Sequence, residues 1–100
     1  MKLLKPLVVR RVQGHSMVPV LPPRTLVLAT GLGRACRPGD IVIFKHDGKE
    51  KIKRVDQVLG DGSLYVVGEH PETSTDSRQF GAIDPKSVIG RVIWPHPHPE

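Results

Sequence analysis

Residues 37–68 read RPGDIVIFKHDGKEKIKRVDQVLGDGSLYVVG, and in this stretch short runs of Val and Ile alternate with turn residues. Arg37-Pro38-Gly39-Asp40 precedes the first run, Asp47-Gly48 separates two runs, and Gly60-Asp61-Gly62-Ser63 separates the next two. Asp followed by Gly between two apolar runs is a strong hairpin signal, because these residues tolerate the backbone angles of tight turns. The middle of the chain is therefore predicted to be a series of β-hairpins.

The same alternation of β-branched runs and turn residues extends toward both ends of the chain. It predicts six strands, at residues 7–13, 25–30, 41–46, 51–58, 64–68 and 88–94. The best helix signal is a single turn at residues 84–87, where Asp84 can cap the turn and Pro85 occupies its first position. We expect a mainly β fold, a small barrel or half-barrel of short hairpin-connected strands with at most one or two helical turns.

The composition supports a single β-rich domain. The chain has 100 residues, an ordinary size for one domain. Gly and Pro number 10 each, which opposes a helical bundle, while 38% hydrophobic and 25% charged residues are typical of a soluble folded protein. We expect one folded domain over residues 1–94 and a flexible tail over residues 95–100, where Pro and His alternate.

Several functional classes are excluded by the composition. Cys36 is the only cysteine, so the chain can form neither an internal disulfide nor a cysteine-based zinc site. The net charge of +5 permits nucleic-acid binding, but four scattered aromatic residues offer little for bases to stack on, and we expect no nucleic-acid partner. No apolar run approaches the ~20 residues of a membrane span, and Met1–Val9 lacks the features of a secretory signal. We expect a cytoplasmic protein.

The first segment with chemical potential is GHSMVP, residues 14–19. A predicted strand ends here in Gly14, which permits close approach of another backbone, and Pro19 prevents the strand from continuing. Such a corner can present the hydroxyl of Ser16, although an ordinary strand end with an exposed serine has the same pattern. His15 is a poor base for this serine, because neighbouring residues of an extended segment point to opposite faces.

The second segment, KIKRV at residues 51–55, places three cations in a predicted strand. A lysine can act as a general base when burial or a neighbouring cation lowers its pKa toward neutrality, and Lys53 beside Arg54 is a candidate. Alternation puts Lys53 on the same face as Lys51 and Val55. The alternative is a solvated lysine that protects an edge strand from aggregation.

The third segment, GEHPETSTDSRQFG at residues 68–81, is a loop rich in hydroxyl groups, with Asp76 and Arg78 two residues apart. By itself it fits a polar loop whose side chains satisfy their own backbone.

In this order the three segments closely resemble the type I signal peptidase family of serine/lysine proteases. Residues 16–21 resemble its nucleophile motif, Lys53-Arg54-Val55 its lysine motif, and Ser74–Arg78 with Gly81 its C-terminal motif. Residues 37–42 and 89–92 resemble the family as well, so that the likeness extends roughly from Val12 to Trp94.

The resemblance implies a Ser/Lys dyad within residues 1–94. Ser16 would be the nucleophile, Lys53 the general base and Ser74 the group that orients Lys53, while Asp76 and Arg78 would form an ion pair that braces the loop. Backbone N–H groups at Gly14 and Ser16 would form the oxyanion region. It also implies a precursor protein as substrate, bound as an added extended strand, and neither a metal nor another cofactor.

Some positions depart from the family pattern. Gly14 stands where many bacterial members carry a serine, Gly68-Glu69-His70 replaces the usual Gly-Asp-Asn, and Pro23-Arg24 replaces a Gly-Asp pair. The compact form without an anchor, with the motif STDSRQFG at residues 74–81, is most similar to nickel-type superoxide dismutase maturation proteases. That resemblance implies removal of a short N-terminal extension from the dismutase precursor.

Other functions remain open at this point. One is signal-peptidase-like processing of secretory precursors. Another is the related self-cleaving stress-response repressor fold, which normally cuts its own N-terminal linker, whereas only fifteen residues precede Ser16 here. A third is an inactive β module that binds extended peptides.

Overall fold

The computed structural model describes residues 7–31 and 35–96. Strands are the main regular structure, with only short helical turns beside them in the described ranges, and the predicted mainly β fold is confirmed. The strands are β1 (Leu7–Arg11), β2 (Leu26–Thr30), β3 (Ile41–His46), β4 (Lys49–Val58), β5 (Leu64–Val67) and β6 (Val88–Trp94). Their bounds differ from the predicted ones by at most two residues.

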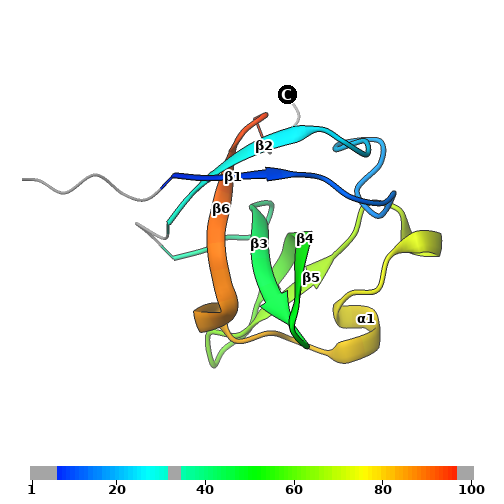
Figure 1. The fold of residues 1–100 in the computed structure, drawn as a ribbon. Coiled ribbons are helices and arrows are strands. Elements are labelled where there is room, and N and C mark those ends of the chain that lie inside the picture. Colours follow the sequence, from blue (N-terminus) through cyan, green and yellow to red (C-terminus); the bar gives the residue numbers. More distant parts are fainter. Residues whose placement is uncertain (1–6, 32–34, 97–100) are drawn as a thin grey trace, which may run out of the picture.

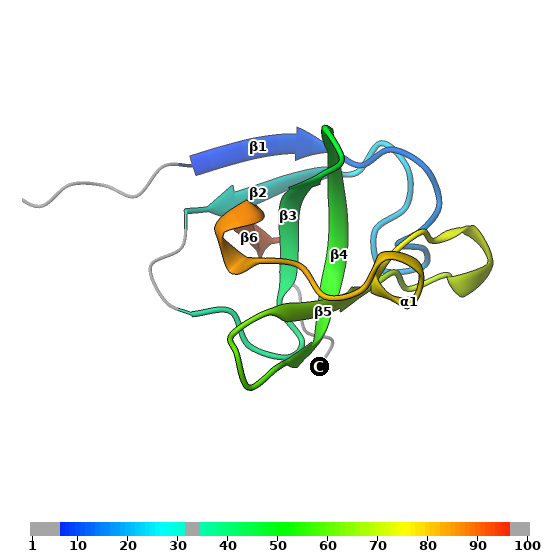
Figure 2. The same cartoon turned by 90° about the horizontal axis from the view of Figure 1, so that it is seen from below.

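The six strands form one antiparallel sheet in the order β1-β2-β6-β3-β4-β5. β1 and β5 are the two edges of the sheet, so the sheet is not closed. The fold is therefore an open sheet and not a closed barrel. Register shifts interrupt the β2–β6 and β3–β6 pairings, and such irregularities bend and twist a sheet. As a result the β1–β2 ribbon crosses the ends of β3 and β4 (Figures 1 and 2).

The central strand β3 is buried on both faces. Ile41 and Ile43 pack in one hydrophobic cluster, while Val42 and Phe44 pack in a second one on the opposite face. The run from residue 41 to 44 is therefore uninterrupted by polar residues, as expected for a strand covered on both sides. The first cluster also holds Met17 and Leu21, which anchor the segment between β1 and β2.

Three helical turns occur among the described residues: η1 (Pro71–Thr73), α1 (Ser77–Phe80) and η2 (Pro85–Ser87). The sequence predicted only the last, where the Asp84 side chain accepts a hydrogen bond from Lys86 N–H. The turn α1 begins with a capping box in which Asp76 and Gln79 satisfy each other's backbone. The Asp-x-x-Gln spacing is a sequence signal for this turn that the interpretation as a polar loop did not use.

Gly68 lets the polar loop pack against the segment that carries Ser16. A Cβ at position 68 would lie 2.2 Å from Ser74 Oγ and 2.7 Å from the Ser16 carbonyl oxygen. The His70 N–H also donates to that carbonyl oxygen at 2.9 Å. This close fit, which depends on a residue without a side chain, joins two parts of the chain that are about fifty residues apart.

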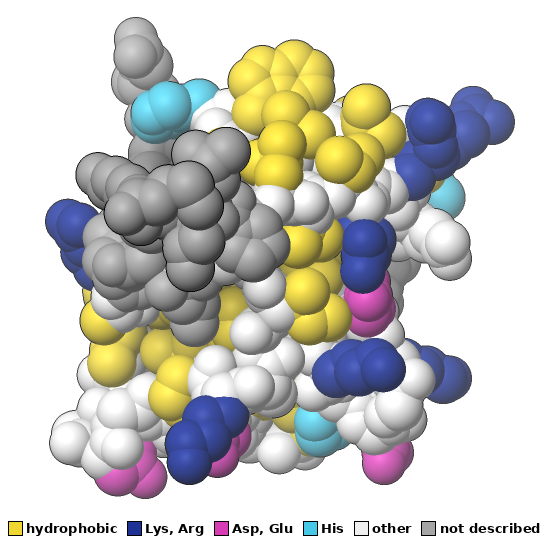
Figure 3. Space-filling model, turned by 60° about the vertical axis from the view of Figure 1, so that its left-hand side comes forward, with side chains coloured by type: hydrophobic (Ala, Val, Ile, Leu, Met, Phe, Trp, Pro, Cys, Tyr) yellow, Lys and Arg dark blue, Asp and Glu magenta, His cyan; other side chains and the backbone are white. Residues whose placement is uncertain are grey.

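Large apolar side chains are exposed on β1, β2 and β6, among them Leu7, Val9, Leu26 and Trp94. Figure 3 shows hydrophobic side chains at the surface on one side of the molecule. No helix within residues 7–31 and 35–96 is both long and apolar enough to cross a membrane. Of the expected tail over residues 95–100, the last four residues lie outside the described ranges.

Candidate active site

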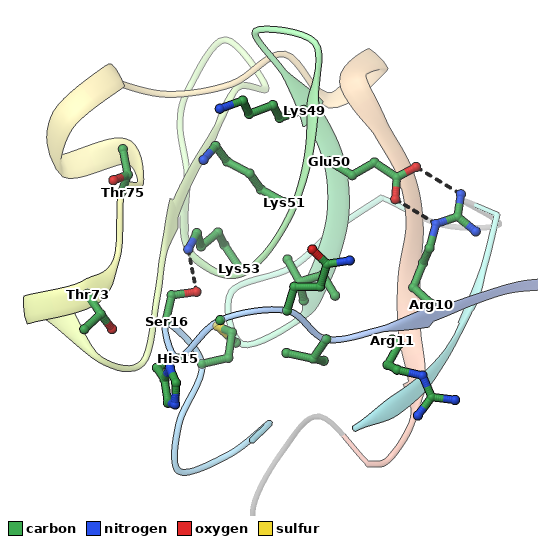
Figure 4. A pocket seen from close by; sticks show the side chains of 15 residues that line it. Arg10, Arg11, His15, Ser16, Lys49, Glu50, Lys51, Lys53, Thr73 and Thr75 are labelled. Atoms are coloured by element: carbon green, nitrogen blue, oxygen red, sulfur yellow. Dashed lines mark hydrogen bonds and ion pairs between the residues drawn. The ribbon is translucent and has the colours of Figure 1, made fainter. Parts of the chain in front are cut away.

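A cavity of about 570 Å³ lies between the end of β1 and the first half of β4. Residues 10–17 form one wall, residues 49–53 form the other, and Thr73 and Thr75 of the polar loop border it. Figure 4 shows Ser16 and Lys53 pointing toward each other across this cavity. The structure thus brings the serine and the lysine singled out in the sequence to the same place.

The Lys53 amine donates a hydrogen bond to Ser16 Oγ, with 2.8 Å between the two atoms. Lys53 is only 4% exposed, whereas Ser16 is half-buried. A protonated amine can only donate, but a neutral amine at this distance can accept the hydroxyl proton. The pair therefore has the geometry of a nucleophile and its base.

Burial lowers the pKa of Lys53 from 10.5 to about 8, and the positive charges of Lys51 and Arg78 act in the same direction. The negative charge of Asp76 opposes the shift. Near pH 8 about half of the molecules thus carry a neutral Lys53 amine. Desolvation is the dominant cause, because an ammonium ion removed from water loses its hydration.

Arg54 was predicted to lower the pKa of Lys53 because the two residues are neighbours in the sequence, but the side chain of Arg54 is engaged elsewhere. Its side chain forms an ion pair with Glu69 and donates to the Gly39 carbonyl oxygen at 2.7 Å. The cations that lower the pKa of Lys53 are Lys51 and Arg78 instead. This expectation was wrong because adjacent strand residues point to opposite faces of a sheet.

A turn rather than an extended segment carries Ser16. Gly14 has a φ of +77°, and a Cβ added at this residue would meet no atom within 4 Å, so glycine is needed there for its backbone angle and not for close approach. The Leu21 N–H donates to the Met17 carbonyl oxygen at 2.7 Å, and both of these side chains are buried. The exposed His15 points away from Ser16 in Figure 4, as expected, although the backbone reason is different.

Asp76 is fully buried and accepts hydrogen bonds from several donors. Its Oδ2 atom accepts from Ser74 Oγ at 2.5 Å, from Arg78 Nη2 at 2.5 Å and from the Gly68 N–H at 2.7 Å. Burial alone would raise the pKa of this carboxyl, but the hydrogen bonds from Arg78, Gly68 and Ser74 together hold it well below its usual value. Asp76 is therefore an anion that ties the loop together.

The Ser74 hydroxyl gives its hydrogen to Asp76. Among the described residues it has no hydrogen bond to Lys53, so the predicted orienting role of Ser74 stays a prediction. Asp76 instead acts on Lys53 through its charge. The link from the loop to the lysine amine is electrostatic in this arrangement.

The backbone N–H groups of Gly14 and Ser16 meet no acceptor in the parts of the chain that the structure describes. Both residues line the cavity. Two backbone N–H donors beside a serine hydroxyl are the kind of groups that form an oxyanion hole. Within residues 7–31 and 35–96, no three His, Cys, Asp or Glu side chains are grouped in a way that could hold a metal ion.

Gly68 is the residue of this site whose importance the sequence did not reveal. It was noted only as the start of an atypical motif, whereas the structure places it in contact with both Ser74 and the Ser16 backbone. A glycine at the end of a strand was the available signal. It could not specify which two segments would meet there.

Because its charge is buried, Lys53 destabilises the fold at neutral pH, and the change Lys53→Met should stabilise it. With a folded pKa of about 8 against 10.5 for the unfolded chain, the penalty is complete below pH 8 and disappears as the pH rises toward 10.5. We expect a gain of about 1–3 kcal/mol in the free energy of unfolding at pH 7, measured by urea denaturation.

The matched control for this stability change is Lys86→Met, on an exposed residue of η2. It should change the free energy of unfolding by less than about 0.5 kcal/mol. A Lys53→Met protein that is less stable than the parent at pH 7, or a gain that persists unchanged at pH 10.5, would contradict a destabilising buried amine.

The family model of the Peptidase S24-like family matches residues 3–93 of this chain. The chain is also similar to the mitochondrial ATP-independent inner membrane protease subunit 1b of Arabidopsis thaliana, with 30% identity over 109 residues. It is 33% identical over 110 residues to the mitochondrial inner membrane protease subunit 1 of Mus musculus. A shorter match, 42% identical over 41 residues, links it to signal peptidase IB of Staphylococcus aureus.

These matches cover different shares of the proteins. The two mitochondrial matches include 81% and 82% of this chain, but only 64% and 66% of the relatives. The match to signal peptidase IB includes 38% of this chain and 22% of that protein. None of these three relatives is a nickel-type superoxide dismutase maturation protease. The predicted likeness to that group of proteases therefore has no support among them. The match of the family model over nearly the whole chain shows that the chain belongs to the Peptidase S24-like family.

Proposed function

We propose that this chain is a serine endopeptidase of signal-peptidase-like type, in which Ser16 is the nucleophile and Lys53 the general base. The observation that carries the proposal is the buried Lys53 amine, 2.8 Å from Ser16 Oγ, in an open cavity. A structural lysine is normally solvated or paired with an acid. The pKa of about 8 lies close to the pH at which a base works best.

The reaction would proceed through an acyl-enzyme. The neutral Lys53 amine takes the hydroxyl proton as Ser16 Oγ attacks the scissile carbonyl carbon, and the N–H groups of Gly14 and Ser16 stabilise the oxyanion. The Lys53 ammonium then gives its proton to the leaving amine as the peptide bond breaks. In the second half, Lys53 takes a proton from water, whose oxygen attacks the ester carbonyl carbon. As the ester bond breaks, the Lys53 ammonium gives this proton to Ser16 Oγ, and the carboxylic acid leaves.

Two unpaired strand edges support the binding of an extended substrate. Among the residues that the structure describes, β1 pairs only with β2, so its other edge is open there, and residues 10–14 line the cavity. β5 pairs with β4 only from Arg54 onward. Within residues 7–31 and 35–96, β3 is therefore the only strand that pairs with residues 49–53. A substrate strand between these edges would find backbone donors and acceptors on both sides.

The relatives favour precursor proteins as substrates. Signal peptidase IB is named for the removal of signal peptides, and small residues before the scissile bond are the preference implied by the family resemblance. The nickel-type superoxide dismutase precursor remains a separate prediction, which rests on the likeness of residues 74–81 to that branch.

The purified chain should cleave a secretory precursor peptide that has small residues before the scissile bond. The measurement is the mass and N-terminal sequence of the product, with the nickel-type dismutase precursor tested in parallel. Cleavage of the dismutase precursor alone would favour the narrower substrate. If neither precursor is cut, the proposed function is wrong, and a loss of mass from the protease itself would indicate self-cleavage instead.

Ser16 and Lys53 should act as one catalytic unit. We expect Ser16→Ala and Lys53→Met each to lower the cleavage rate by about 10³-fold or more, and the double variant to be little worse, because residues of one unit are non-additive. Matched controls are Ser63→Ala and Lys86→Met, which do not line the cavity. Substantial activity in either dyad variant would rule out this assignment, whereas peptide binding without cleavage by the parent would indicate a binding module.

The rate should increase with pH along a limb centred near pH 8, because only the neutral Lys53 amine accepts a proton. Lys51→Gln removes a charge that lowers the pKa of Lys53 and should move the limb to higher pH, while Asp76→Asn removes an opposing charge and should move it to lower pH. Profiles of kcat/KM from pH 6 to 10 measure this. A flat profile, or limbs that do not move in opposite directions, would speak against a lysine base.

A further inference from the structure

Lysines occupy alternate positions along the first half of β4, at Lys49, Lys51 and Lys53. Figure 4 shows their side chains stacked above one another, with the three amines turned toward the same side of the strand as Thr75. Lys53 is the buried residue at Ser16, Lys51 is half-buried and Lys49 is exposed. This row of lysines runs outward from the catalytic pair toward the β3–β4 turn.

A second cavity of about 290 Å³ continues the first one along this row. Lys49, Lys51 and Thr75 line both cavities. The groove therefore does not end at Ser16 and Lys53 but passes between β4 and the polar loop as far as Phe80 and His46. A bound chain would have room beyond the reacting bond on this side.

The charges along this part of the groove are unbalanced. Glu50, which lies between Lys49 and Lys51 in the sequence, is already paired with Arg10 at 2.7 Å. Lys49 and Lys51 have no acidic partner among the described residues. The wall opposite them presents Thr73 and Thr75, which carry no charge, and only at the far end does Asp47 line the groove beside Lys49.

We propose that Lys51, and more weakly Lys49, make this protease selective for substrates with acidic side chains at alternate positions on one side of the scissile bond. The proposal rests on the proposed function, in which the substrate adds as a strand along residues 49–53 of β4. Alternate residues of a strand are about 6.8 Å apart, so that an extended substrate repeats the spacing of the lysines. Acids two and four residues from the position opposite Lys53 would face Lys51 and Lys49.

The selectivity should be modest and sensitive to salt. Each pair of opposite charges that face each other across neighbouring strands should strengthen binding by roughly 1.4- to 5-fold. Two pairs multiply to about 2- to 25-fold in affinity, and we expect the middle of this range, about 3- to 10-fold. Lys51 should contribute the larger part, because it is half-buried and lies farther from Asp47 along the strand. At about 1 M salt, where the screening length is about 3 Å, most of the effect should disappear.

The test uses the Ser16→Ala protein, so that binding is measured without cleavage and the effect of Lys51 on the reaction rate through Lys53 does not enter the measurement. The probes are fluorescein-labelled ten-residue peptides with small residues around the scissile position. Each carries two Asp or two Gln at alternate positions, placed either before or after that bond. Fluorescence anisotropy gives the dissociation constants at about 0.1 M and about 1 M salt.

We expect the Asp peptide to bind about 3- to 10-fold more tightly than its Gln counterpart on one side of the bond only. Adding Lys51→Gln should remove most of this difference, adding Lys49→Gln less of it, and adding Lys86→Gln, which changes the net charge equally, none. A difference that survives Lys51→Gln, or that Lys86→Gln also removes, would overturn the proposal. So would equal binding of Asp and Gln peptides on both sides.

Cleavage of the same peptides by the parent protein separates this proposal from the proposed function. Cleavage without any preference for Asp would leave the peptidase assignment standing and overturn the acidic selectivity. Tighter binding of the Asp peptides without cleavage by the parent would support the charged groove and contradict the peptidase assignment.

Discussion

The removal of the Lys53 amine from water is the constraint on which the site depends. A lysine in contact with solvent would be charged at neutral pH and could not take a proton from Ser16. At 4% exposure the desolvation dominates over the opposing charge of Asp76, and the pKa falls to about 8. In the proposed mechanism, the burial that activates the amine also opposes folding, which is a frequent relation between activity and stability in enzymes.

Two separate anchors keep Lys53 covered. On one side, the turn that carries Ser16 is fixed because Met17 and Leu21 are buried in the first hydrophobic cluster. On the other side, the polar loop is fixed by the buried carboxylate of Asp76, which accepts hydrogen bonds from Ser74, Gly68 and Arg78. Gly68 allows the two sides to meet. The apolar core and a polar network thus hold opposite walls around one amine.

The arrangement of the sheet leaves the cavity beside Ser16 and Lys53 open along two strand edges. The sheet remains unclosed, and the edge of β1 and the first half of β4 face the same cavity without a strand between them. The Arg10–Glu50 ion pair joins the two walls at the level of Lys49 and Lys51, because Glu50 lies between these two lysines in β4. Shape and charge along this groove are consistent with recognition of an extended chain rather than of a small molecule.

Much of this protein could be predicted from local sequence, since the hairpin turns and the β-branched runs determine the strands with errors of at most two residues. The order of motifs predicted Ser16 and Lys53 as a pair, and the structure places Lys53 Nζ 2.8 Å from Ser16 Oγ. Periodicity could not decide that Lys53 is buried while Lys49 is exposed, because both lie on the same face of β4. Nor could it show that Arg54 pairs with Glu69, or that the loop meets Ser16 through Gly68. These outcomes depend on contacts between segments far apart in the chain, and burial exists only once those segments have packed together.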